Sequence, residues 1–284
     1  MTALDRRLFA FRDDLADAAL SGRVVAPRFV AGRPARVTAS FADLRRAPRP
    51  DAGLDTQLLR GDAVRIFDEV EGWAWIQAER DSYVGYVGAE ALGAPGEAPT
   101  HLVAVPRTFL YPGPDMKLPP TGILSLGCGL AVVGFEERRG TSYAAIASGE
   151  AIIAAHLRPV GAHADDYVAV AETLLHTPYL WGGATAFGID CSGLVQLSMH
   201  MAGHDVLRDS DMQAAGIGDP LEADPSQLRR GDLVFWKGHA AIMTDGETIL
   251  HANGRTMMVS REPLAAAIDR IATLYGRPTG FRRP

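Results

Sequence analysis

The sequence has only two cysteines among its 284 residues, Cys128 and Cys191. Two cysteines cannot form the disulfide framework that stabilises many small secreted domains, and neither belongs to a Cys-x-x-Cys pair. In a reducing compartment both should remain thiols. Cys128 lies in the apolar, glycine-rich stretch SLGCGLAVVG, which is typical of a buried and unreactive cysteine.

The chain also lacks an excess of basic residues and any long apolar run. Its net charge of −6 argues against a nucleic-acid binder, which normally carries a basic face. No apolar run approaches the roughly 20 residues that span a bilayer, so no membrane partner is expected. The first 20 residues alternate charged and apolar side chains and lack the apolar core of a signal peptide. These features indicate a cytoplasmic protein.

Composition divides the chain into four parts. Residues 1–33 are predicted to be a helical extension, because Leu8, Phe11 and Leu15 follow helical spacing. Residues 34–96 and 97–160 contain short strands with turns and form a weak repeat, which predicts two small β-barrels. Residues 161–284 contain predicted helices followed by strands, which is typical of an α+β domain.

The first β-rich part resembles the bacterial SH3-like domain found beside cell-wall hydrolases. Its motifs occur in that family's order: Leu44-Arg45, Leu58-x-x-Gly61-Asp62 before a strand, Gly72-Trp73, and Gly85-Tyr86-Val87. The second β-rich part departs further from that pattern, because it lacks the Gly-Trp pair.

Cys191 directly follows the turn residues Gly188-Ile189-Asp190 and opens the segment CSGLVQLSMHMAGH. Leu194, Leu197 and Met201 share one helical face, which predicts a helix that begins at Cys191. A helix N-terminus favours the thiolate over the thiol, and its unpaired N–H groups can bind a developing oxyanion. This position indicates a nucleophile rather than an inert core residue.

Two later histidines, His239 and His251, are candidates for the base. The segment GHAAIMTDGETILHANG predicts a β-hairpin with Asp245-Gly246 in its turn. A three-residue loop of residues 244–246, with Gly246 in the left-handed conformation, places Met243 opposite Glu247 and His239 opposite His251. A two-residue Asp-Gly turn would instead place the histidines on opposite faces. We predict the three-residue loop.

In this interpretation His239 takes the proton of Cys191 to give a thiolate–imidazolium pair, and His251 orients the His239 ring. Two alternatives remain at this point. The histidines could be half-exposed surface residues, or they could form a two-histidine metal site with Asp190 or Cys191. The metal site has no clear third ligand, so we expect neither a metal nor another cofactor.

The C-terminal part resembles the NlpC-type family of papain-like bacterial cell-wall cysteine peptidases. The matching residues are Tyr179, Trp181-Gly182-Gly183, Asp190-Cys191-Ser192-Gly193, Gly231-Asp232-Leu233-Val234-Phe235, His239 and His251. The resemblance implies a papain-like α+β fold and hydrolysis of γ-D-glutamyl bonds to a diamino acid. It also implies Cys191 as nucleophile, His239 as base, His251 as third polar residue, and Tyr179 beside the oxyanion site. One departure is Ala241, where the family often has glycine.

A subset of this family is similar in layout, with SH3-like domains before the peptidase. The similarity implies a murein stem peptide with a free N-terminal L-Ala as substrate, cut in cell-wall peptide recycling to release L-Ala-γ-D-Glu. A buried ammonium needs acidic and hydroxyl acceptors. The candidates are Asp190, Ser192, Ser210, Tyr83, and either Asp62 or Asp81. Alternatively, Ser210 caps a short helix and Tyr83 is a core residue of the barrel.

Three other functions compete with this one. A secreted enzyme could digest the intact wall, a catalytically inactive domain could bind wall fragments, or the thiol could transfer an acyl group to an amine or lipid. The diamino acid could be diaminopimelate or lysine.

Overall fold

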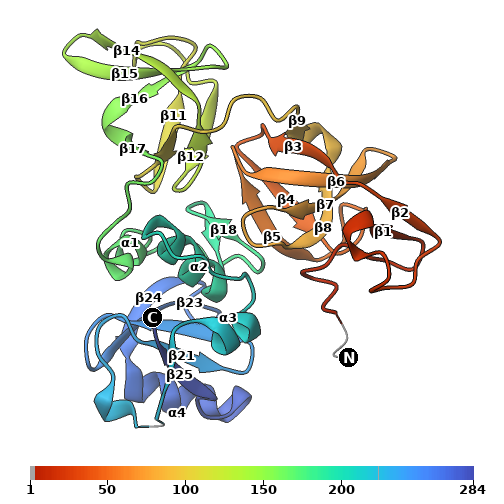
Figure 1. The fold of residues 1–284 in the computed structure, drawn as a ribbon. Helices are drawn as coiled ribbons and strands as arrows, with labels where there is room; N and C mark the ends of the chain where they lie inside the picture. The colour runs from red at the N-terminus through yellow and green to blue at the C-terminus, as the bar shows by residue number, and fades with distance from the viewer. Residues whose placement is uncertain (1–3, 223) are drawn as a thin grey trace. The chain divides into compact units, whose positions relative to one another are not determined.

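The computed structural model describes residues 4–222 and 224–284 and contains two compact units, Met1–Val160 and Gly161–Pro284 (Figure 1). No helix among the described residues is long and apolar enough to cross a membrane.

The N-terminal extension differs from its prediction, because residues 4–33 contain no α-helix. The segment holds β1 (Leu15–Asp17), the short 3₁₀ helix η1 (Ala18–Leu20) and β2 (Arg28–Val30). Ala10 and Leu15 are buried in a small cluster with Phe67 and Trp75, which belong to the following sheet. Burial of apolar residues against the sheet therefore replaces the predicted amphipathic helix, since tertiary packing overrides helical spacing.

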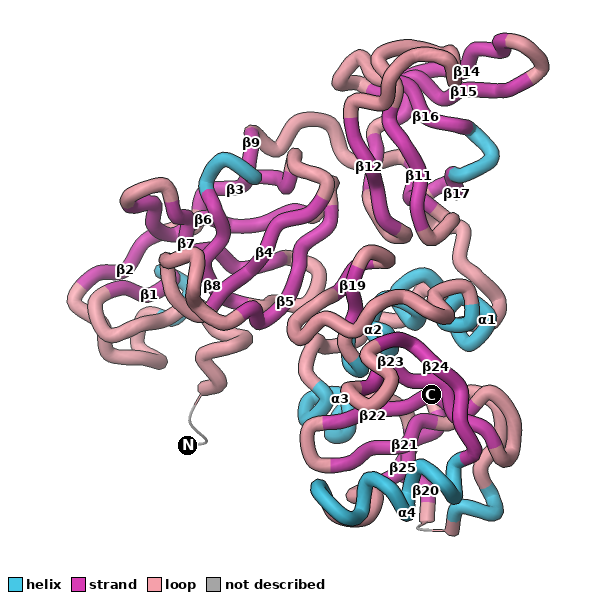
Figure 2. The backbone as a smooth tube through the Cα atoms, turned by 180° about the vertical axis from the view of Figure 1, so that it is seen from behind, coloured by secondary structure: helices cyan, strands magenta, loops and turns pink. Residues whose placement is uncertain are grey.

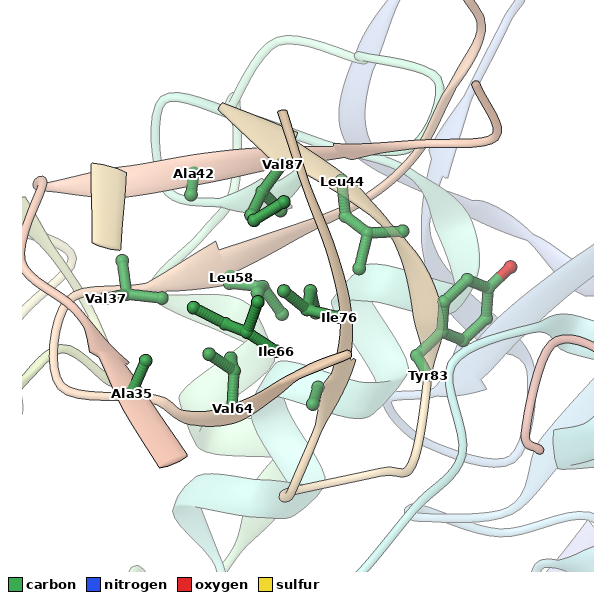
Figure 3. Packing of buried hydrophobic residues seen from close by; sticks show 12 residues of the cluster. Ala35, Val37, Ala42, Leu44, Leu58, Val64, Ile66, Ile76, Tyr83 and Val87 are labelled. Carbon is green, nitrogen blue, oxygen red and sulfur yellow. The ribbon is translucent and has the colours of Figure 1, made fainter. Parts of the chain in front are cut away.

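The first β-rich segment forms one antiparallel sheet with the strand order β5-β4-β8-β7-β6-β3-β9. Its elements are β3 (Arg33–Val37), β4 (Phe41–Arg45), β5 (Leu54–Leu59), β6 (Ala63–Val70), β7 (Trp73–Ala78), β8 (Val84–Gly88), η2 (Ala89–Ala91) and β9 (Leu92–Gly93). The alternating apolar residues of these strands, such as Leu44, Leu58 and Ile76, point into one core (Figure 3).

The second β-rich segment is built from three smaller sheets, with strand orders β13-β10-β17, β11-β12 and β14-β15-β16. Its elements are β10 (His101–Val103), β11 (Arg107–Leu110), β12 (Gly122–Ser125), β13 (Gly129–Leu130), β14 (Val132–Arg138), β15 (Thr141–Ile146), β16 (Ala151–Ile153), η3 (Ala154–His156) and β17 (Leu157–Pro159). Cys128 is fully buried here, and burial raises its thiol pKa to about 12.

The C-terminal unit has an α+β fold around a six-stranded antiparallel sheet with the order β20-β25-β21-β22-β23-β24. Figures 1 and 2 show α1 and α2 on one side of this sheet and α4 on the other. Its elements are α1 (Tyr167–Glu172), β18 (Ala184–Thr185), β19 (Gly188–Ile189), α2 (Cys191–Met201), α3 (Ser210–Gly216), β20 (Asp219–Leu221), η4 (Pro225–Gln227), β21 (Leu233–Trp236), β22 (His239–Met243), β23 (Thr248–Asn253), β24 (Met258–Pro263), α4 (Leu264–Tyr275) and β25 (Gly280–Arg283).

The predicted helix that begins at Cys191 is confirmed, since α2 runs from Cys191 to Met201. Gly203 follows it with a φ of +84°, a left-handed conformation that glycine adopts without steric cost and that commonly ends a helix. α2 packs against β22 and β23, so the sheet fixes the position of the helix N-terminus.

Candidate active site

The N-terminus of α2 is held by Asp190, which is its N-cap residue. Oδ1 of Asp190 accepts a hydrogen bond of 2.7 Å from the backbone N–H of Gly193, and Oδ2 accepts one of 2.9 Å from Gly182. The chain approaches itself closely here, because a Cβ on Gly183 would lie 2.5 Å from the carbonyl oxygen of Gly188. The Trp-Gly-Gly motif therefore positions the loop that carries the cysteine.

Arg208 completes this arrangement and was not anticipated from the sequence. Its side chain is 1% exposed, donates a 2.7 Å hydrogen bond to Oδ2 of Asp190, and donates another of 2.7 Å to Oγ of Ser192. Ser192 in turn donates a 3.3 Å hydrogen bond to Oδ1 of Asp190. A carboxylate has about four lone-pair sites, and Asp190 uses all four. Accepting a substrate ammonium would therefore require Asp190 to release one of these partners.

Replacing Arg208 with methionine should lower the free energy of unfolding by about 3–5 kcal/mol, because Asp190 would remain buried without its counter-ion. Urea unfolding of the two proteins measures the difference. A matched control is Arg230→Met, which removes the ion pairs of a 40% exposed guanidinium with Asp166 and Glu172 and should cost about 1 kcal/mol, because both pairs are open to water. Equal losses in the two variants would show that Arg208 does not hold the site together.

Tyr179 lies beside the nucleophile. Its N–H bonds to the carbonyl of Met257, and an isolated bridge joins it to Ile189, two residues before Cys191. Burial, and next the nearby Cys191, raise the pKa of the Tyr179 phenol. Among the described residues the phenol has no hydrogen-bond partner, so it can donate to a bound group.

The hairpin register differs from its prediction by two residues. Met243 pairs with Ile249 and Ile242 with Leu250, so the loop comprises residues 245–247 rather than 244–246. Oδ1 of Asp245 accepts hydrogen bonds from the N–H groups of Glu247 and Thr248, at 2.8 and 2.7 Å, and Gly246 does not adopt a positive φ. The side chain of Asp245, rather than a left-handed glycine, therefore sets the turn.

A shift of two residues keeps the same side chains on the same face of a strand. Continuing the register places His251 opposite Ala241, diagonal to His239. The two rings meet, with 2.9 Å between Nε2 of His239 and Nδ1 of His251. His251 is fully buried, whereas His239 is partly exposed.

Cys191 lies close to the same strand, because α2 packs against β22 and the backbone of Ala240 approaches the thiol. Ala240 directly follows His239 in β22. The thiol is 7% exposed, and both cysteines are free. The structure thus brings the helix N-terminus, the thiol and the histidine-bearing hairpin together.

The pKa shifts of Cys191 and His239 disfavour the thiolate–imidazolium pair expected from the sequence. Burial, together with the nearby Asp190, raises the pKa of the Cys191 thiol to about 12. Burial, together with His251, lowers the pKa of His239 to about 3. Removing both groups from water disfavours their charged forms. At neutral pH the free protein therefore holds a neutral thiol and a neutral imidazole, and the proton moves only as the thiol attacks.

Glu262 extends the histidine pair and was also missed from the sequence. Nε2 of His251 lies 2.9 Å from Oε1 of Glu262, a close polar contact without the alignment of a full hydrogen bond. Arg270 of α4 forms an ion pair with the same carboxylate. His251 and then Arg270 lower the pKa of Glu262 to about 2. No local signal in the sequence indicates this contact, because it depends on the pairing of β24 with β23, in which Glu262 lies opposite Ile249.

The remaining candidates of this unit are Ser192 and Ser210. Ser192 is buried and engaged with Asp190 and Arg208, as described above. Ser210 is the first residue of α3, so Asp209, not Ser210, occupies the cap position. The Ser210 hydroxyl has no hydrogen-bond partner in the described part of the chain.

The candidates of the N-terminal unit have local partners. Tyr83 is 4% exposed and belongs to the barrel core, with its hydroxyl directed away from the other labelled side chains (Figure 3). Asp62 accepts a 2.8 Å hydrogen bond from the N–H of Leu59 and lies 3.2 Å from the guanidinium of Arg80. Asp81 accepts a hydrogen bond from the N–H of Tyr83. Their predicted role toward a substrate amine stays a prediction.

Comparison with known proteins identifies the two kinds of domain. Residues 176–272 match the model of the NlpC/P60 family, and residues 44–92 match the bacterial dipeptidyl-peptidase Sh3 domain. The C-terminal unit is an NlpC/P60 domain. A crystal structure of an NlpC/P60 family protein from Bacillus cereus has the same fold, with a TM-score of 0.73 at 23% identity, covering 88% of this chain and 99% of that chain.

Similarity to relatives of the NlpC/P60 domain extends through both units. Dipeptidyl-peptidase 6 of Lysinibacillus sphaericus is 28% identical over 84% of this chain and 98% of its own length. The γ-D-glutamyl-L-lysine dipeptidyl-peptidase of Bacillus subtilis is 28% identical over 71% of this chain and 73% of its own. The chain therefore combines an NlpC/P60 domain with a bacterial SH3-like domain, and its similarity to these dipeptidyl-peptidases includes both.

Proposed function

We propose that the chain is a cysteine peptidase that hydrolyses the bond between γ-D-glutamate and a diamino acid in murein stem peptides with a free N-terminal L-Ala. It releases L-Ala-γ-D-Glu, and it acts in the cytoplasm on peptides returned from the wall. The observation that carries the chemistry is the meeting of Cys191, at the N-terminus of α2, with the strand that bears the His239–His251 pair.

The geometry supports a defined proton path. Nε2 of His239 is bonded to His251, which leaves Nδ1 of His239 to accept the thiol proton. The Cys191 sulfur attacks the γ-carbonyl carbon of D-glutamate. The tetrahedral oxyanion is stabilised by the N–H of Cys191, which is unpaired among the described residues, and by the phenol of Tyr179.

Collapse of this intermediate breaks the amide bond. The leaving amine of the diamino acid takes the proton from His239, and a thioester remains on Cys191. Water then attacks the thioester while His239 again accepts a proton. Hydrolysis releases the γ-carboxyl group of L-Ala-γ-D-Glu and restores the thiol.

The substrate preference is supported by similarity over the full layout rather than over the catalytic domain alone. Dipeptidyl-peptidase 6 of L. sphaericus aligns with 98% of its own length, so the match includes the β-rich segments. On the catalytic side, the unbonded hydroxyl of Ser210 is a candidate acceptor for the substrate ammonium.

The experiment that tests this function is incubation of the purified protein with L-Ala-γ-D-Glu-diaminopimelate and, separately, with the lysine peptide. Mass spectrometry should detect L-Ala-γ-D-Glu and the free diamino acid. Cleavage between L-Ala and D-Glu, or no cleavage of either peptide, would contradict the proposal.

A further inference from the structure

A line of three polar side chains crosses the strands β22, β23 and β24. His239 lies diagonal to His251, and His251 lies directly opposite Ser260, so Glu262 is again on the diagonal. The contacts follow this line, with 2.9 Å between His239 and His251 and 2.9 Å between His251 and Glu262.

We propose that Glu262 is a positioning residue that sets the tautomer of both histidines and so keeps Nδ1 of His239 free to take the proton of Cys191. The assignment rests on the catalytic roles proposed above for Cys191 and His239. Glu262 does not need to touch the substrate, since it acts through His251.

The charge of Glu262 determines which proton its neighbour His251 must carry. Its carboxylate forms ion pairs with Arg270, which lies on α4, and with Arg255 at 4.0 Å. These two cations keep it ionised at neutral pH, in agreement with its lowered pKa. An ionised carboxylate can only accept hydrogen bonds.

When both rings are neutral, each imidazole has one N–H and one lone pair, so the carboxylate fixes the order of protons along the line. Nε2 of His251 faces the carboxylate and must carry the proton, so Nδ1 of His251 is an acceptor. Nε2 of His239 faces that acceptor and must carry its own proton. Nδ1 of His239 is then the lone pair, which is the state that a general base needs.

The opposite order of protons would disable the site. If Nε2 of His251 carried the lone pair, two acceptors would face each other across 2.9 Å. His251 would then donate from Nδ1, and Nδ1 of His239 would carry a proton and could not accept one from the thiol. Burial of His251 excludes bulk water as a substitute partner, so the carboxylate decides between the two states.

The direct test reads the tautomers by ¹⁵N NMR of protein labelled at histidine. The chain has eight histidines, and His239→Gln and His251→Gln variants assign the two signals. In the unmodified protein at neutral pH both rings should be protonated at Nε2. Protonation of either ring at Nδ1 would overturn the inference without any substrate.

Two substitutions separate the tautomer from the charge. Glu262→Met removes the acceptor and should convert a substantial part of both rings to the other tautomer, lowering kcat about 10- to 100-fold with little change in KM. Glu262→Gln can keep an amide oxygen at the position of Oε1, so it should retain the tautomers and most of kcat. If Glu262→Gln lowers kcat as far as Glu262→Met does while the tautomers persist, then the charge of Glu262 matters for catalysis. In that case the proposed action of Glu262 through the tautomers is wrong.

Glu172→Met is the matched control. Glu172 also pairs with two arginines, Arg230 and Arg261, through contacts of 2.9 and 2.7 Å. This variant should change neither the tautomers nor kcat. An unmodified protein that cleaves no stem peptide would refute the proposed function, whereas the NMR result stands independently of it.

Discussion

Replacing Cys191 with alanine should lower kcat for the stem peptide by about 10⁴-fold or more, to the limit of detection. The loss is large because no other group in the site can form the covalent intermediate, and removal of a nucleophile usually eliminates nearly all catalysis. Far-ultraviolet circular dichroism and the melting temperature should change little, because the thiol fills a small volume and its close polar neighbours include backbone groups such as those of Ala240 and Ser192.

The second cysteine provides the control for this experiment. Cys128→Ala should keep kcat within about twofold, because Cys128 lies in the N-terminal unit, where its thiol donates to the Ser40 carbonyl at 3.5 Å. Burial raises the pKa of both thiols to about 12. A difference in kcat between the two variants therefore reflects where each cysteine lies and not a difference in thiol acidity. Persistent cleavage in Cys191→Ala, or loss in Cys128→Ala with the fold intact, would remove Cys191 from the mechanism.

Replacing His239 with alanine should lower kcat by about 10³- to 10⁴-fold. The resting thiol is neutral, so the reaction depends on a base that takes its proton during attack. A preformed thiolate would be less sensitive to this change, since its proton would already be lost. Steady-state kinetics on the stem peptide measures the effect.

His204→Ala serves as the matched control, because His204 is exposed just beyond the C-terminal end of α2 and should not affect kcat. Full activity in His239→Ala would show that another group acts as the base. Raising the pH provides a further check, since hydroxide can partly replace a missing base and should increase the residual rate of the variant.

The relation of His239 to His251 shows how far sequence patterns determine a site. Side chains alternate between the two faces of a strand, so a register error of two residues leaves each side chain on its predicted face. The two histidines were therefore correctly predicted to share a face, although the predicted register was wrong by two residues. The helix start at Cys191 was also predictable, because the turn residues and the apolar spacing after it are local signals.

The features that sequence reasoning missed depend on contacts between distant residues. Arg208 meets Asp190 through a loop between two helices, and the predicted N-terminal helix is replaced by packing of Leu15 against Trp75. Glu262 reaches His251 only because β24 pairs with β23. A single sequence carries the hydrophobic pattern of each element, but not the pairing that brings elements together.

The central claim is cleavage of the γ-D-glutamyl bond in peptides that begin with a free L-Ala. The most direct measurement is a competition in one tube between L-Ala-γ-D-Glu-diaminopimelate and its N-acetylated form, followed by mass spectrometry. We expect release of L-Ala-γ-D-Glu from the free peptide at least about 100-fold faster, because an acetylated nitrogen carries no charge and cannot make the ionic hydrogen bonds of an ammonium. Equal rates of cleavage for the two peptides would contradict it.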